Sequence, residues 1–68
     1  MVGGAAVNSV APGVVGAVIA GGGATNYSGD YSPNTVASDF GTIGGGNNNT
    51  IQTTAFESAI GGGCLNTI

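Results

Sequence analysis

The sequence predicts an all-β fold in which a short repeat is stacked on itself as a β-solenoid. The first observation is a block of nine residues at 43–51, Ile-Gly-Gly-Gly-Asn-Asn-Asn-Thr-Ile, which returns at 60–68 as Ile-Gly-Gly-Gly-Cys-Leu-Asn-Thr-Ile. The second is the composition, because 15 glycines and only three charged side chains in 68 residues suit a stacked β surface with polar ladders. Repeats of about this length are typical of solenoid architectures.

Further copies of the block extend the repeat through the whole chain. The shared pattern is a branched aliphatic residue, two or three glycines, two free positions, Asn, a hydroxyl residue and another branched aliphatic residue. Copies start at positions 2, 20, 43 and 60, so their spacing is uneven and is widest between the second and third. We interpret residues 1–68 as one β-solenoid segment and a fragment of a longer repeat protein, with copies at 2–10, 20–28, 28–36 (degenerate), 43–51 and 60–68.

The individual elements follow from this repeat. Residues 2–10 predict a strand, a glycine corner and the start of a second strand, and Pro12-Gly13 predicts a turn. Residues 14–20 are the most β-prone run, apolar on both faces, and predict a buried strand. Residues 21–31 predict a layer with an insertion that loops out. Later strands are expected at 42–43, 49–54 and 55–60.

Each residue type in the block has a physical role. Glycine permits positive φ and close backbone approach at a corner, and Asn can bond its own backbone and stack with the Asn of the next layer. The structural residues of the repeat are therefore Gly44, Gly45, Gly46, Asn49, Gly61, Gly62, Gly63 and Asn66. The predicted core positions are Ile43, Ile51, Ile60 and Ile68. At about 1.5–3 kcal/mol for each buried side chain, one small chain gains too little alone, so we expect several chains to share one core.

Several classes of function lack the residues they require. The absence of Lys and Arg removes the main source of affinity for nucleic acid and for anionic membranes. The absence of His leaves no base for a Ser or Cys nucleophile and no credible zinc site. Glycine runs without a following Lys do not form a phosphate loop. We therefore expect no enzyme activity, no cofactor and no metal.

A few side chains carry open alternatives. Asp39 and Glu57, separated by close to one repeat, predict exposed loop carboxylates on adjacent layers, and an acid/base pair is the alternative. Cys64 occupies a free position, as a small tolerated residue or as the site of an intermolecular disulfide. Tyr27 and Tyr31 predict a surface contact. The two phenylalanines, Phe40 and Phe56, are interpreted as covers for the end of an apolar column.

Targeting signals in the chain are weak. Residues 10–20 have the length of a signal-peptide core, but the positive flank is missing and Pro12 interrupts the run, so a buried layer is the preferred interpretation. The run is too short to span a bilayer, and we expect no membrane insertion by this segment.

The blocks at 42–51 and 58–68 resemble the head repeats of the YadA-like trimeric autotransporter adhesins and related phage-fibre repeats. The resemblance implies a left-handed parallel β-roll and a homotrimer whose apolar columns meet around the threefold axis. It also implies a location outside the cell, on a bacterial outer surface or phage fibre, with a host-surface protein or glycan as partner. The chain departs from that family in its uneven spacing and in having no visible stalk, neck or membrane anchor.

These observations lead to a functional expectation with two alternatives. The expected function is a non-catalytic structural and adhesive module of a surface fibre. The first alternative is a β-solenoid that binds a patterned surface such as ice or polysaccharide, suggested by the Asn-Thr pairs at 49–50 and 66–67. Uneven layer spacing argues against a flat ice-binding face. The second alternative is a solenoid that cleaves polysaccharide, with Glu57 as an essential carboxylate.

Overall fold

The computed structural model describes residues 1–27 and 29–68, and these residues form strands, turns and bends without any helix. The all-β prediction is therefore confirmed at the level of fold class. The strands are only two to four residues long. They are β1 (Ser9–Val10), β2 (Val18–Ile19), β3 (Ala24–Tyr27), β4 (Asp30–Ser32), β5 (Thr35–Val36), β6 (Thr42–Ile43), β7 (Thr50–Ile51) and β8 (Ala59–Ile60).

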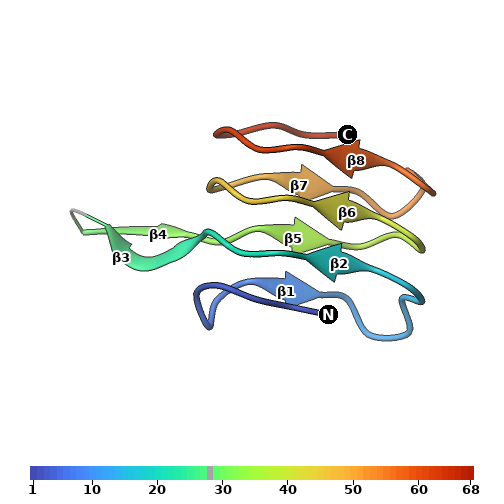
Figure 1. The fold of residues 1–68 in the computed structure, drawn as a ribbon, viewed down its shortest axis with the longest axis horizontal. Coiled ribbons are helices and arrows are strands. Elements are labelled where there is room, and N and C mark those ends of the chain that lie inside the picture. Colours follow the sequence, from blue (N-terminus) through green and yellow to red (C-terminus); the bar gives the residue numbers. More distant parts are fainter. Residues whose placement is uncertain (28) are drawn as a thin grey trace.

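Two parallel sheets run through the whole molecule. One sheet has the order β1-β5-β7 and the other the order β2-β6-β8, while β3 and β4 form a separate antiparallel hairpin. Figure 1 shows the chain passing repeatedly through both sheets, from the N-terminus at one end of the stack to the C-terminus at the other. We call one such pass a layer and name it by its strands: the β1 layer, the β2–β5 layer, the β6–β7 layer and the β8 layer.

The register aligns the branched aliphatic residues into two columns. In the first sheet Val10 pairs with Val36 and Val36 with Ile51. In the second sheet Ile19 pairs with Ile43 and Ile43 with Ile60, and an isolated bridge adds Val2 next to Ile19. Successive layers therefore repeat the same kind of side chain at the same place, which is the pattern that parallel in-register strands require.

The residues that make the repeat spacing uneven lie outside the two sheets. The longest interval between paired positions, from Val10 to Val36, contains the β3–β4 hairpin, which leaves the stack between Gly23 and Pro33. The shortest interval, from Val36 to Ile51, lacks a turn that the neighbouring layers carry at 12–13 and 53–54. The sheets thus keep a regular register although the repeat length varies.

The core lies between the two sheets of a single chain. Its buried members are Ala17, Ile19, Val36, Ile43, Ile51 and Ile60, with Val10, Val14 and Ala55 packed against them. The two columns bury each other within one chain, so burial of these side chains does not require a second chain. Among the predicted core positions, Ile43, Ile51 and Ile60 are buried, whereas Ile68 is 44% exposed because it lies in the outermost layer.

The predicted strand at 14–20 is much shorter in the structure. Only Val18 and Ile19 form a strand, and Val15 is exposed. The reason is Gly16, whose φ of 71° lies in the left-handed region and turns the chain at a corner. The apolar run therefore predicted too long a strand, because half of it forms a corner between the two sheets.

No helix among residues 1–27 and 29–68 is long and apolar enough to cross a membrane.

Candidate functional site

The glycine corner follows β2, β6 and β8, and one glycine position in it has a left-handed φ in every layer. Gly4, Gly22, Gly46 and Gly63 have φ angles of 74°, 77°, 85° and 103°. A Cβ atom at Gly46 would collide with the carbonyl oxygen of Gly63 in the next layer. At Gly45 and Gly62, by contrast, a Cβ atom would meet nothing within 4 Å. In the 44–46 triplet, the first and third glycines thus both lie close to the backbone of the next layer, while the middle one faces open space.

A ladder of asparagine amides runs beside this corner. The Asn49 Nδ2 atom donates to the carbonyl oxygens of Gly45 (2.9 Å) and Gly63 (3.0 Å), and its Oδ1 atom accepts from the Asn66 N–H (3.0 Å). Asn34 makes equivalent bonds one layer earlier, and its Oδ1 atom accepts from the Asn49 N–H at 3.1 Å. The members of the ladder are Asn8, Asn34, Asn49 and Asn66. Because the amides of Asn8, Asn34 and Asn49 each bond the next layer along the chain, the ladder fixes the register of the stack.

The copy predicted at 20–28 does not supply its asparagine to this ladder. Asn26 lies in β3 of the hairpin, and Asn34, from the copy predicted at 28–36, occupies the ladder position of that layer. The two sequence copies therefore contribute a glycine corner and an asparagine to one layer, with the hairpin between them. The signal in the sequence was the Asn-Thr-Val ending at 34–36, which matches Asn-Thr-Ile in the later copies.

The opposite corner of the stack carries a cluster of exposed apolar side chains. Val15, Phe40 and Phe56 are 58%, 57% and 59% exposed, and we call them the phenylalanine corner. Phe40 donates its backbone N–H to the Val15 carbonyl oxygen at 2.8 Å, so Val15 and Phe40 lie next to each other in adjacent layers. The interpretation of Phe40 and Phe56 as covers for the apolar column is wrong, because both rings lie outside the sheets.

Backbone conformation explains why Phe40 points outward. Phe40 and Glu57 have φ angles of 58°, and Gly16 has the same left-handed conformation one layer earlier. The Phe40 ring lies against Gly16, where a Cβ atom would come within 2.5 Å of the ring. A non-glycine residue in this region of φ is uncommon and is held there by the surrounding contacts.

The Asp39 carboxylate and the backbone of Glu57 both take part in hydrogen bonds at this corner. The Asp39 Oδ1 atom accepts from the Val15 backbone N–H at 2.8 Å, and the Asp39 carbonyl oxygen accepts from the Glu57 N–H at 3.1 Å. Asp39 is half-buried and Glu57 is exposed. The side chain of the third carboxylate, Asp30, lies outside the described part of the structure. Within the described residues, no group of three or more His, Cys, Asp or Glu side chains could hold a metal ion.

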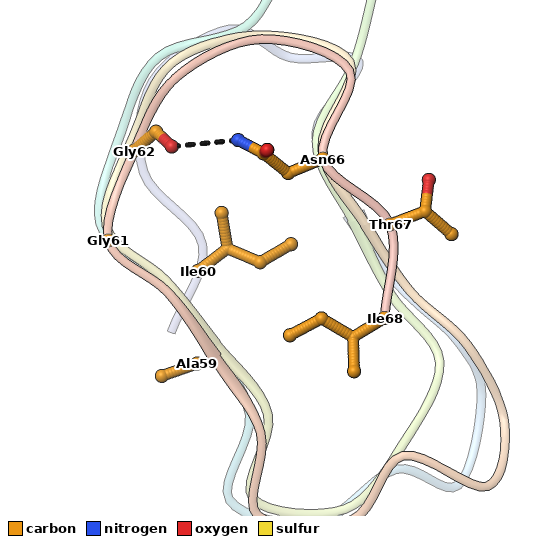
Figure 2. A pocket seen from close by; sticks show the side chains of 7 residues that line it. All are labelled: Ala59, Ile60, Gly61, Gly62, Asn66, Thr67 and Ile68. Atoms are coloured by element: carbon orange, nitrogen blue, oxygen red, sulfur yellow. Dashed lines mark hydrogen bonds between the residues drawn. The ribbon is translucent and has the colours of Figure 1, made fainter.

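A column of hydroxyl side chains follows the outer face of the β1-β5-β7 sheet. Ser9 pairs with Thr35 and Thr35 with Thr50, and an isolated bridge places Thr67 next to Thr50. All four are exposed or half-buried, and Figure 2 shows Thr67 pointing away from the interior. Parallel strands are about 4.8 Å apart, so this column presents hydroxyl groups at that interval.

The other residues singled out from the sequence lie at the surface. Tyr31, in β4, is exposed on the hairpin, which projects from the glycine-corner side of the stack in Figure 1. Tyr27 belongs to β3, but its side chain is outside the described part of the structure. Cys64 is a free, exposed cysteine that bridges to Asn47 through the backbone register.

A hollow of about 360 Å³ opens on the outermost layer, at the C-terminal end of the stack. Figure 2 shows Ile60 and Ile68 pointing into the space between the sheets and the Asn66 amide pointing to Gly62. The hollow is therefore the interior of the stack as seen from its open end. Its lining consists of Ala59, Ile60, Gly61, Gly62, Asn66, Thr67 and Ile68.

Comparisons with protein-family models, with curated proteins and with solved structures find no match to this chain.

Proposed function

We propose that the chain is a non-catalytic structural and adhesive module, a segment of a left-handed β-solenoid that assembles as a homotrimer in a surface fibre. The observation that carries this proposal is the phenylalanine corner. Val15, Phe40 and Phe56 come from successive layers and are all exposed, on a stack whose own core is already closed. Exposed apolar clusters of this kind are typical of contact surfaces. The trimer is thus held by this corner, in place of a shared interior.

The adhesive part of the proposal rests on the β3–β4 hairpin. This element stands outside the regular stack, carries the exposed Tyr31 and forms no part of either parallel sheet. Tyrosine combines an apolar ring with a hydroxyl group, which suits contact with glycans and protein surfaces. Insertions that leave a solenoid on one face are often the binding elements of such proteins. The partner we propose is a host-surface protein or glycan met outside the cell.

Lateral assembly is tested by light scattering on a Phe40→Ser/Phe56→Ser double variant. Both rings are exposed, so the fold should survive, which circular dichroism would check. We expect three chains per particle for the original corner and one for the double variant. A Thr53→Ser variant, altered at an exposed position of the neighbouring turn, is the matched control. Equal masses for the original chain and the double variant would contradict the role of this corner.

Adhesion is tested on a glycan array and on cultured epithelial cells with the fluorescently labelled protein. Tyr31→Ser should lower the bound signal at least tenfold, whereas Thr53→Ser should leave it unchanged. Binding that survives both Tyr31→Ser and removal of the hairpin would contradict adhesion through this element. Release of sugar from any arrayed glycan, lost in Glu57→Gln, would contradict a non-catalytic module.

A second candidate function, binding to a patterned surface such as ice, is favoured by the hydroxyl column. Uneven repeat spacing argued against binding to a patterned surface, but the residues that cause it lie outside the sheets. The hydroxyl side chains are therefore aligned, at Ser9, Thr35, Thr50 and Thr67. Thermal hysteresis of the freezing point that is lost in a Thr35→Leu/Thr50→Leu variant would support this function. Absence of hysteresis in the unaltered protein would remove it.

A further inference from the structure

A second hollow, of about 320 Å³, lies at the base of the β3–β4 hairpin, and we call it the hairpin hollow. The hairpin leaves the β2–β5 layer after Gly23, and Figure 1 shows it extending past the glycine corners of the neighbouring layers. Both layers that form the hollow have a neighbouring layer on either side, so it does not depend on an end of the stack. Its lining consists of Gly22, Gly23, Ala24, Gly46 and Asn47.

The backbone around the hairpin hollow is held by hydrogen bonds between layers. Gly23 donates its N–H to the Gly46 carbonyl oxygen at 2.7 Å, which joins the two layers at the hollow itself. Asn47 donates its N–H to Gly63 O (3.0 Å), and its own carbonyl oxygen accepts from the Leu65 N–H (3.2 Å). The β8 layer therefore holds Asn47 from the other side. A hollow fixed in this way exists before a ligand binds, which lowers the conformational cost of binding.

Asn47 supplies the polar side chain of the hairpin hollow. The stack itself does not require an amide at this position, because Gly23 occupies it one layer earlier and Cys64 one layer later. Asn47 is half-buried, and its amide, unlike that of Asn49, has no hydrogen-bond partner among the described residues. The amide therefore offers a ligand an N–H donor and an oxygen acceptor side by side.

The chemistry of the lining matches a neutral, hydroxyl-rich ring. The described lining combines peptide groups and one amide with glycine Cα atoms and the Ala24 methyl group. A sugar ring presents hydroxyl groups at its edge and C–H groups on its faces, and each hydroxyl both donates and accepts, as the amide does. The chain contains no Lys, Arg or His that could pair with an acidic ligand. The volume is at the lower end of the range for small-molecule sites and suits a single sugar ring.

We propose that the hairpin hollow binds one ring of a neutral saccharide, held by the Asn47 amide and the glycine backbone. This inference rests on the adhesive part of the proposed function and deepens it, because it selects a neutral glycan as the partner and names the contact. Tyr31 directly precedes Ser32, which pairs with Ala24 in the hairpin. The exposed Tyr31 is therefore near enough to contact a further part of the same glycan.

The test compares three variants with the original chain. Asn47→Ala removes the amide and leaves the hollow open, whereas Ala24→Leu keeps the amide and fills the hollow. Gln52→Ala is the matched control, because it removes an exposed amide that lies outside the hollow. Circular dichroism would verify that all three variants retain the β signal of the original chain.

The readout is binding to an array of neutral, sialylated and sulfated glycans, followed by titration with the free neutral sugar that terminates the bound glycan. The original chain and Gln52→Ala should bind neutral glycans with equal affinity. Asn47→Ala should bind about tenfold more weakly or worse, because the hydrogen bonds from the amide to the sugar are lost. Ala24→Leu should not bind. Equal affinity of Asn47→Ala and the original chain would overturn the proposal, and so would binding restricted to sialylated or sulfated glycans.

Adhesion to cells separates this inference from the function on which it rests. Adhesion that is lost in Tyr31→Ser but unchanged in Asn47→Ala would overturn the saccharide site and leave adhesion through the hairpin standing. Cell binding by an original chain that binds no arrayed glycan would have the same meaning, with a protein as the partner. An original chain that binds neither cells nor glycans would overturn both.

Discussion

At the level of single residues, glycine and asparagine have different structural roles in the glycine corner. Gly46 accepts a left-handed φ and lets the backbone of the next layer approach, while Asn49 bonds carbonyl groups of the turn and of the next layer. The consecutive glycines look equivalent in sequence, but their surroundings differ. The middle glycine, Gly45, faces open space, so no neighbouring atom restricts a side chain at this position.

Replacing Gly46 by Ala should therefore destabilise the protein, whereas replacing Gly45 should not. The alanine at 46 must hold a positive φ and its Cβ atom must displace the Gly63 carbonyl, which together should cost about 2 kcal/mol or more. Gly45→Ala should change stability by less than about 1 kcal/mol. Urea unfolding followed by circular dichroism would measure both, and equal losses would contradict the distinction.

Truncating the ladder at Asn49 should be more damaging than truncating its neighbour Asn47. Asn49→Ala removes one bond from each of two carbonyl oxygens and from one N–H, and the loss should be about 3 kcal/mol at roughly 1 kcal/mol for each bond. Asn47→Ala removes a half-buried amide that makes no such bonds and should cost less than about 0.5 kcal/mol. A thermal melt of each variant would check the order.

Replacing Ser38, unlike replacing Gly46 or Asn49, is expected to raise the stability of the protein. Its Oγ atom is buried and has no hydrogen-bond partner among the described residues, and Ala55 occupies the equivalent position one layer later. Ser38→Ala should raise the free energy of unfolding by about 1 kcal/mol because the desolvated hydroxyl is removed. The exposed Ser9→Ala variant is the control and should be close to neutral. A lower melting temperature for Ser38→Ala would contradict this account.

At the scale of elements, the β3–β4 hairpin is an insertion that the stack does not need. Gly23 and Pro33 lie where Asn47 and Asn48 lie in the next layer, so the two sheets continue on either side of the hairpin. Asn48 has a φ of 56°, a conformation that proline cannot adopt. A deletion that joins Gly23 directly to residue 33 must therefore also replace Pro33.

Deleting residues 24–32 together with Pro33→Asn should leave the stack intact. We expect an unchanged melting temperature to within a few degrees and retention of the β signal, because none of the ladder bonds described above comes from this segment. The same deletion with Pro33 kept should melt at a lower temperature, since the φ of proline is incompatible with the turn. Loss of ordered β structure in both variants would show that the hairpin supports the stack.

The block at 43–51 and 60–68 was enough to predict an all-β class, but other elements were misplaced for identifiable reasons. The apolar run at 14–20 hid a corner, since periodicity does not reveal the positive φ of Gly16. Asn26 and Asn34 were equally plausible ladder members until the register excluded the first. Phe40 and Phe56 were interpreted as covers for the end of an apolar column, but both are more than half exposed, and Phe40 has a left-handed φ that hydrophobicity does not reveal.

For the molecule as a whole, the location of the core decides what a core mutation does. Ile43 is fully buried between the two sheets of one chain. Ile43→Asp should therefore unfold the chain itself, because burying an unpaired carboxylate costs several kcal/mol. A core shared between chains would instead give separated but folded subunits. Circular dichroism and light scattering of Ile43→Asp would distinguish the two, and a folded monomer would contradict the closed core.

The direction of the hydrogen bonds gives the stack a mechanical anisotropy. Every bond between the parallel strands, and most amide bonds of the asparagine ladder, run along the stack. A force applied along the stack therefore loads successive layers in series, and they can peel away one after another. A force applied along the strands loads the bonds between two layers together, in shear. A fibre built on this plan would resist sideways drag better than axial pulling.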